Sequence, residues 1–206
     1  MGLVAAIDFE VFYDYNCPFV YRASATIALL RESGARDLRV TWRYFSLAQV
    51  NSDKEGWTAW AAPETEPVRG RLAFKAAEAA RRQDRFDVMH PALLRARHED
   101  RHDLDVMQVV ERVAVEAGLD LERFRADVAA DDILTALARD HQEGVTRHGV
   151  FGTPTFVFRT GVAAYVRLAA VPSPADASRV FDSLVAVAAG EPSIVEIKRP
   201  TRPSPD

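Results

Sequence analysis

The first 45 residues show the hydrophobic patterning of a strand, a helix and a second strand. Residues 7–13 begin by alternating apolar and polar side chains and end as an apolar run, which is typical of a strand entering a buried sheet. In residues 18–30 apolar side chains recur at helical spacing, and Gly34 is suited to ending that helix. Residues 39–45 are rich in β-branched and aromatic side chains and predict a second strand. This βαβ unit should have parallel strands.

A helical pattern follows from residue 56 to residue 148. The segment is rich in alanine, arginine, glutamate and leucine, the composition that helices favour. Gly118 and the pair Asp131-Asp132 look like breaks that precede new helix N-caps. The segment therefore predicts four or five helices that form one all-α unit.

Strand character returns in residues 155–159 and 163–168, which the turn-forming pair Thr160-Gly161 separates into a hairpin. An amphipathic pattern over residues 175–189 predicts a last helix. Residues 199–206 are rich in proline, and we expect them to be a disordered tail.

This order of elements predicts an α/β fold with a large all-helical insertion between a βαβ half and a ββα half. Residues 1–55 and 149–198 would form the α/β domain, and residues 56–148 the helical insertion domain. A chain of 206 residues suits one compact domain split by an insertion.

Composition and charge exclude several classes of partner. A chain that is 48% hydrophobic and 27% charged has the make-up of an ordinary globular protein. A net charge of −4 gives no basic face for nucleic acid. No apolar run approaches the roughly 20 residues that cross a bilayer, so we expect no membrane partner. The N-terminal residues lack the pattern of a secretion signal. The chain has one cysteine, which excludes an intramolecular disulfide and fits a reducing compartment, so we expect a cytoplasmic protein.

The single cysteine, Cys17, lies between the first predicted strand and the first predicted helix. Pro18 follows it and suits the first helical turn. A helix N-terminus offers unpaired N–H groups and the positive end of the helix dipole, both of which favour a thiolate over a thiol. The alternative is a buried cysteine acting as a small hydrophobic residue. The strand-to-helix junction favours the reactive interpretation, with Cys17 substantially deprotonated at pH 7.

A second candidate element is the run Gly-Val-Phe-Gly-Thr-Pro-Thr at residues 149–155. Pro154 directly precedes a predicted strand and cannot donate to its ladder, so it must lie at the strand start or at a distortion. A cis Thr153–Pro154 bond is compatible with this position. The alternative is a simple loop that enters the strand.

Together these two motifs carry a resemblance. The run Asp-Tyr-Asn-Cys-Pro-Phe-Val at residues 14–20, with Val-Phe-Gly-Thr-Pro-Thr-Phe at residues 150–156, resembles the DsbA-like thioredoxin superfamily. Within it the chain is similar to the branch of FrnE-like oxidoreductases, mycothiol-dependent reductases, kappa-class glutathione transferases and hydroxychromene-carboxylate isomerases. The resemblance implies a thioredoxin-like fold with a cis-proline loop opposite the motif cysteine. It further implies that Cys17 is the catalytic nucleophile, that Thr153 and Pro154 bind the substrate thiol, and that Pro18 and Phe19 shape the rim of the site.

The chain departs from the family at one motif position. Oxidoreductase members have Cys-x-x-Cys, whereas here Val20 stands three residues after Cys17. A mixed disulfide at Cys17 must therefore be resolved by a second thiol from solution, a route that thiol exchange permits. The resemblance implies mycothiol or glutathione as that low-molecular-weight thiol. The excess of arginine over lysine, typical of GC-rich genomes, favours mycothiol.

Other candidate residues carry weaker signals. His98 and His102 are four residues apart, but their surroundings are mostly charged, so we expect a solvated helix end and no metal. His148 lies close in sequence to the proline loop, where a structural or surface role is expected. Aromatic residues at these spacings are more typical of the core than of a site; they are Tyr13, Tyr15, Tyr21, Trp57 and Trp60.

The sequence thus predicts a cytoplasmic enzyme, a monothiol oxidoreductase or transferase that acts on a small molecule through Cys17. The enzyme would be a monomer or a homodimer. Two alternatives stay open: a ligand-binding or accessory protein that kept the fold without turnover, and a thiol-dependent isomerase.

Overall fold

The computed structural model describes residues 6–34, 36–191 and 193–198. The tail predicted at residues 199–206 lies outside the described residues. In chain order the elements are β1 (Ile7–Tyr13), α1 (Pro18–Glu32), β2 (Leu38–Tyr44), α2 (Leu47–Val50), α3 (Arg71–Arg82), α4 (Phe86–His98), α5 (Met107–Glu116), α6 (Leu121–Val128), α7 (Thr135–His148), β3 (Thr155–Phe158), β4 (Ala163–Tyr165) and α8 (Ala177–Gly190).

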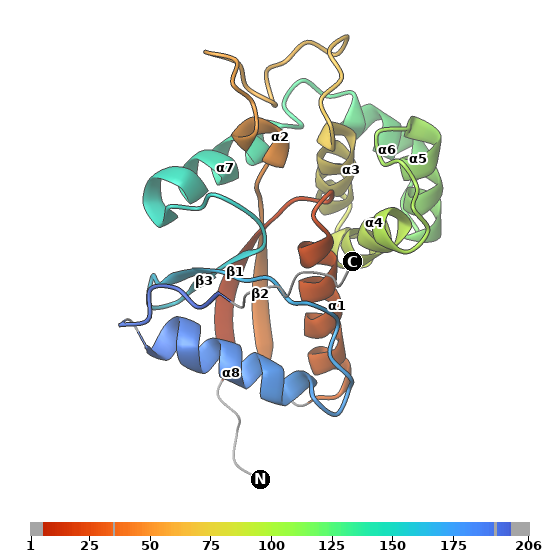
Figure 1. The fold of residues 1–206 in the computed structure, drawn as a ribbon. Coiled ribbons are helices and arrows are strands. Elements are labelled where there is room, and N and C mark those ends of the chain that lie inside the picture. The colour runs from red at the N-terminus through yellow and green to blue at the C-terminus, as the bar shows by residue number, and fades with distance from the viewer. Residues whose placement is uncertain (1–5, 35, 192, 199–206) are drawn as a thin grey trace, which may run out of the picture.

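The four strands form one mixed sheet in the order β2-β1-β3-β4 (Figure 1). The predicted βαβ unit pairs β1 with β2 in parallel, with Phe9 opposite Val40. The predicted hairpin pairs β3 with β4, and β3 runs antiparallel to β1 with Val11 opposite Phe156. The α/β fold that the sequence predicts is confirmed.

Alternation along β1 sends its side chains into two separate apolar layers. Phe9, Val11 and Tyr13 belong to the main core, which α1 and α8 cover. The ring of Phe9 lies 5.7 Å from that of Phe181 on α8. Phe12 points to the opposite face, where it packs in a smaller buried cluster with Phe45, Val150 and Val157.

Helix α7 covers that second face of the sheet. A Cβ added to Gly144 would lie 2.8 Å from the ring of Phe12, so only glycine permits the helix to approach this closely. Arg43 on β2 pairs with Asp140 and Glu143 on the helix. The last helix of the segment predicted as an all-helical unit, residues 56–148, thus packs on the sheet. The division of the chain into domains at residues 55 and 149 stays a prediction.

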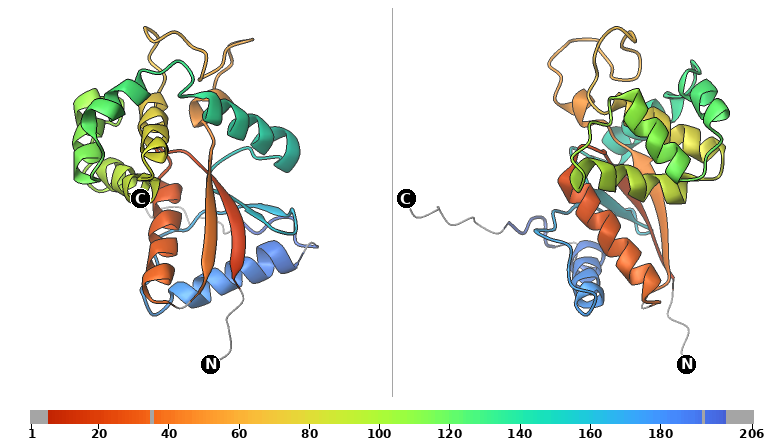
Figure 2. Two further views of the ribbon diagram at one scale, coloured as in Figure 1. Left: turned by 180° about the vertical axis from the view of Figure 1, so that it is seen from behind. Right: turned by 90° about the vertical axis from the view of Figure 1, so that its right-hand side faces the viewer.

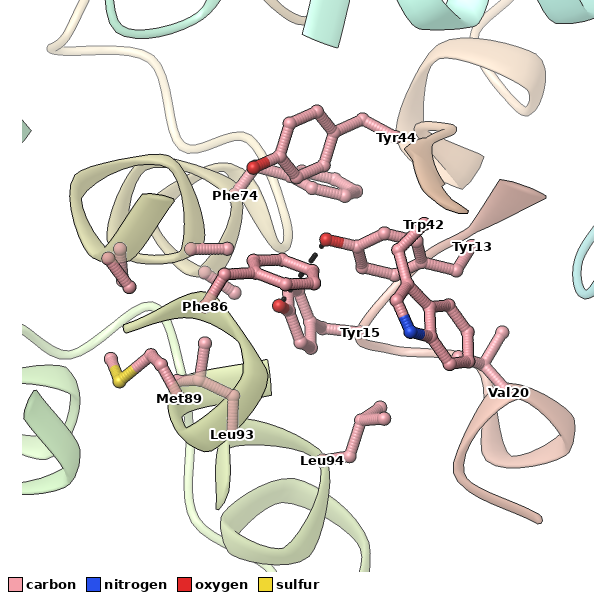
Figure 3. Close-up of a cluster of buried hydrophobic side chains, with 14 of the residues drawn as sticks. Tyr13, Tyr15, Val20, Trp42, Tyr44, Phe74, Phe86, Met89, Leu93 and Leu94 are labelled. Carbon is pink, nitrogen blue, oxygen red and sulfur yellow. Dashed lines mark hydrogen bonds between the residues drawn. The ribbon is translucent and has the colours of Figure 1, made fainter. Parts of the chain in front are cut away.

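Helices α3 to α6 form a cluster beside the sheet, and α4 of this cluster packs against α1 (Figures 1 and 2). Its contact with the sheet is a layer of buried aromatic side chains (Figure 3). The ring of Phe74 on α3 lies 6.3 Å from Tyr13, 5.9 Å from Tyr15 and 5.7 Å from Tyr44. This layer holds the cluster against the segment that precedes Cys17.

The segment between α2 and α3 is irregular, although the sequence predicts helical structure from residue 56. Pro63 and Pro67 cannot donate to a helical ladder. The buried guanidinium of Arg71 instead donates to carbonyl oxygens of this segment, at Ala62, Pro63 and Glu66. Across the described residues, none of the helices has the length and apolar character needed to span a bilayer.

Candidate active site

Cys17 caps the N-terminus of α1 at the end of β1 closest to the helical cluster. Its backbone is extended, with φ −87° and ψ 115°, and Pro18 takes the first helical position. The Cys17 N–H donates to the Asp14 carbonyl at 3.1 Å, which closes the tight turn after the strand. Local sequence signals alone account for this placement.

The Cys17 thiol faces the proline loop. Its Sγ lies 3.1 Å from the carbonyl oxygen of Thr153, which is 136 residues away in the sequence. The Thr153–Pro154 peptide bond is cis. The Pro154 carbonyl accepts from the Val166 N–H at 3.0 Å, which ties the loop to the end of β4. The structure thus brings together Cys17, Thr153 and Pro154.

The Thr153 carbonyl oxygen holds the Cys17 side chain at the proline loop by accepting from its thiol. The side chain is only 5% exposed, whereas the next residue, Pro18, is exposed. To react with a partner molecule, the sulfur must therefore leave the carbonyl and turn outward.

The position of the missing second cysteine lies inside the core. Val20 is fully buried and packs in the main apolar cluster (Figure 3). Its side chain is apolar and offers nothing that could attack a mixed disulfide at Cys17. The structure thus places an inert packing residue where a resolving thiol would lie.

Asp14 organises the turn in front of Cys17. One carboxylate oxygen accepts from the Asn16 N–H at 2.8 Å, and the other from the Leu47 N–H at 2.7 Å. Burial raises the pKa of Asp14 to about 6, although both hydrogen bonds oppose that rise. Gly70 closes over this turn with φ +81°, and a Cβ there would lie 2.3 Å from the Asn16 side-chain amide. The turn is therefore held from two other segments of the chain.

Phe19, which the resemblance implies as a rim residue, lies two residues after Cys17, and two arginines contact its ring. The guanidinium carbon of Arg22 lies 5.1 Å from the ring centre and that of Arg167 lies 4.2 Å away. Nη1 of Arg22 also donates to the Leu168 carbonyl at 2.9 Å. This rim combines residues of α1 with the segment after β4.

An exposed pair of aromatic side chains lies beside the proline loop. Phe151 is 66% exposed, and its ring lies 5.0 Å from that of Tyr165, which is also exposed. Both residues adjoin the proline loop in sequence or across the sheet. The buried hydroxyl of Thr153 has no hydrogen-bond partner among the described residues.

The histidines singled out in the sequence lie elsewhere. Nε2 of His98 lies 2.9 Å from the Tyr15 carbonyl, so this imidazole supports the turn before Cys17. Among the described residues no three histidine, cysteine or acidic side chains gather as metal ligands would. His148 lines a hollow of about 380 Å³ between α7 and the sheet. That hollow adjoins the start of β1, at the other end of the strand from Cys17.

Buried tyrosines link the turn before Cys17 to the helical cluster. The hydroxyl of Tyr15 lies 3.1 Å from Nδ1 of His90 and 3.4 Å from the hydroxyl of Tyr13 (Figure 3 shows the tyrosine pair). Burial, with a smaller effect from the Arg81 charge, lowers the pKa of His90 to about 3. Burial raises the pKa of Tyr15. Both side chains therefore stay neutral in the folded protein at ordinary pH.

The neutral state of His90 predicts a loss of stability in acid. Unfolded histidine takes up a proton near pH 6.5, whereas folded His90 does so near pH 3, so the unfolded state binds more protons between these values. Stability therefore falls as the pH drops from about 6.5 toward 3. We expect His90 to account for a loss on the order of 2 kcal/mol in the free energy of unfolding between pH 7 and pH 4.5.

Urea unfolding of the wild type and of His90→Asn at pH 7 and at pH 4.5 measures this loss of stability. The variant should be less stable at pH 7 and lose less on acidification. His102→Asn, at a partly exposed histidine, should keep the full loss. Burial also lowers the pKa of His141 to about 4, so this histidine adds a further loss of stability in acid. Asp14, with its raised pKa of about 6, has the opposite effect and stabilises the folded state as the pH falls below 6. An undiminished loss in His90→Asn would contradict the prediction.

The two arginines beside Phe19 were not among the residues predicted from the sequence. Arg22 lies three residues after Phe19 on the same helix, a spacing that could have revealed the pair. Arg167 had no such signal, because only the pairing of strands brings it to Phe19.

A helix-capping cysteine that faces a proline loop on a mixed four-stranded sheet defines a thioredoxin-fold protein with a thiol site. Residues 8–166 match the DSBA-like thioredoxin domain. The chain belongs to that family, as the sequence motifs predict. The specific branch suggested by the resemblance stays a prediction.

Curated relatives by sequence include a protein much longer than the matched segment. The chain is 32% identical over 145 residues to the Na(+)/H(+) antiporter NhaA 1 of Mycobacterium sp. (strain KMS); the match covers 69% of this chain and 20% of the antiporter. The chain thus spans about a fifth of the length of that curated relative.

Solved structures share the fold at lower identity. A probable DsbA oxidoreductase from Streptomyces coelicolor superimposes with a TM-score of 0.62 at 20% identity, over 97% of both chains. The cytosolic disulfide reductase DsbM from Pseudomonas aeruginosa, solved with GSH, gives a TM-score of 0.59 at 19% identity, over 88% of this chain and all of that one. Both are thiol oxidoreductases of the DsbA type.

Proposed function

We propose that this protein is a cytoplasmic monothiol oxidoreductase that exchanges disulfides with a low-molecular-weight thiol and acts on a small molecule. One observation carries the proposal: Cys17 occupies the N-cap position of α1 and its sulfur lies 3.1 Å from the Thr153 carbonyl at the proline loop, while fully buried Val20 stands at the position of the second cysteine. The family and its thiol oxidoreductase members support the class of reaction. The GSH in the DsbM structure supports a glutathione-type thiol.

The reaction proceeds in two balanced exchanges. The Cys17 thiolate attacks the sulfur of the small thiol in a mixed disulfide between that thiol and the substrate. The original S–S bond breaks, the substrate leaves as a thiolate that takes a proton from water, and Cys17 becomes disulfide-bonded to the small thiol. A second molecule of the small thiol, as its thiolate, then attacks the sulfur of that adduct. This step releases Cys17 and forms the oxidised dimer of the small thiol.

The residues of the site have distinct parts in this cycle. The helix N-terminus stabilises the Cys17 thiolate when it turns away from Thr153. The Thr153 backbone, whose carbonyl oxygen the Cys17 sulfur faces, binds the incoming sulfur compound at the proline loop. Val20 keeps the adduct from internal resolution, so the cycle waits for a thiol from solution.

Intact-mass analysis tests the proposal. Incubation with oxidised glutathione should add one glutathionyl group to the protein, and reduced glutathione should then remove it. Cys17→Ser treated in parallel should stay unmodified. An unmodified wild type, or an adduct that reduced glutathione does not release, would overturn the monothiol cycle.

A further inference from the structure

We propose that Arg22 and Arg167 form a cationic rim that selects carboxylate-bearing thiols and disulfides for Cys17. This inference rests on the proposed function and names the chemical class of its co-substrate. The rim is defined as these two arginines and the Phe19 ring that both of them contact.

The rim joins the two segments that carry the site. Phe19 is two residues after Cys17, and Arg22 is one helical turn further along α1. Arg167 follows Val166, whose N–H donates to the Pro154 carbonyl at 3.0 Å. One arginine therefore comes from the helix that begins at Cys17, and the other from the segment that is hydrogen-bonded to the proline loop.

Both arginines keep their charge available. Among the described residues no carboxylate pairs with either of them, whereas Arg43 on β2 contacts Glu10, Asp140 and Glu143. A guanidinium that lies over an aromatic face still presents its N–H edge, the geometry that binds a carboxylate through two hydrogen bonds. The aromatic ring holds the positive groups in place without neutralising them.

This arrangement distinguishes between the thiols that the sequence suggests. Glutathione carries two carboxylates, which the rim would attract. Mycothiol is an uncharged sugar-linked thiol and would gain nothing from the arginines. The structure therefore favours a glutathione-like, carboxylate-bearing thiol as the co-substrate.

Two chromogenic disulfides that differ in charge test the rim. Dithiobis(nitrobenzoate) carries two carboxylates, and 4,4′-dithiodipyridine is uncharged near neutral pH. For each disulfide, the rate constant of its reaction with Cys17 is divided by the rate constant of its reaction with a small uncharged thiol. This ratio corrects for the different intrinsic reactivities of the two disulfides. The wild type should prefer the dianion, and added salt should weaken that preference.

Single substitutions locate the preference. Arg167→Gln and Arg22→Gln should each lower the relative rate of the dianion by about three- to tenfold and leave that of the uncharged disulfide unchanged. Arg167→Lys, which keeps the charge, should restore most of the loss. Arg159→Gln serves as the control, because Arg159 is also exposed but lies beside the hollow under α7.

The outcomes separate this inference from the proposed function. If Cys17 reacts with both disulfides but shows no charge preference, or if the glutamine variants slow both equally, the rim proposal is overturned and the monothiol cycle stands. If Cys17 reacts with neither disulfide, the proposed function itself fails.

Discussion

Replacing Cys17 with serine should reduce thiol–disulfide exchange by at least about a thousandfold while leaving the protein folded. The sulfur is the one atom at the site that can form the mixed disulfide, and the chain contains no other cysteine to substitute for it. A serine hydroxyl can still donate to the Thr153 carbonyl, so the contact that spans the two motifs survives. Single-turnover kinetics with a chromogenic disulfide measures the rate, and urea unfolding checks the fold.

A second variant, Val20→Cys, tests whether the missing second cysteine is what makes the cycle depend on a thiol from solution. Val20→Cys recreates the two-cysteine motif at a buried position next to the site. The adduct at Cys17 should then be resolved within the protein, and release of the small thiol should no longer need a second thiol from solution.

The serine variant also tests the alternative of a binding protein. If Cys17→Ser leaves ligand affinity and biological activity intact, the protein acts by binding and not by turnover.

Phe74→Ala should lower the free energy of unfolding by about 3–5 kcal/mol. Phe74 is 2% exposed and lies within 6.3 Å, between ring centres, of three tyrosines from the sheet and the turn before Cys17. Removing its ring leaves a cavity between α3 and the sheet, at the contact that holds the helical cluster. Equilibrium urea unfolding with matched m-values measures the change.

Phe151→Ala is the matched control. This phenylalanine is 66% exposed, so its removal should change stability by less than about 0.5 kcal/mol. It lies two residues before Thr153 of the proline loop, so any effect should fall on the exchange rate with aromatic disulfides. A loss at Phe74 as small as the one at Phe151 would contradict the role of the aromatic layer in joining the cluster to the sheet.

Local patterns predicted the elements that form the core of the fold. The periodicities of residues 7–13 and 18–30 match β1 and α1, because period-two and helical spacing are properties of neighbouring residues. The boundaries of β4 and α3 differ from the predictions. The alternating pattern over residues 163–168 continues past Tyr165, where the β4 pairing ends, and the segment before α3 is held by the buried Arg71.

Long-range packing decided what the patterns could not. The amphipathic pattern of α7 resembles that of the other helices, and nothing within it shows that its buried face meets the sheet. The contact that places α7 on the sheet is between Gly144 and Phe12, which lies more than a hundred residues earlier in the sequence.

The sequence by itself determined that Cys17 stands at the start of a helix after a buried strand, and that a proline loop opens a later strand. Both follow from neighbours along the chain. Only the tertiary structure decided that the sulfur faces the Thr153 carbonyl, that Val20 is sealed in the core, and that Arg22 and Arg167 meet at Phe19. The physical reason is that strand pairing brings distant residues into contact, and no local periodicity records which residues those will be.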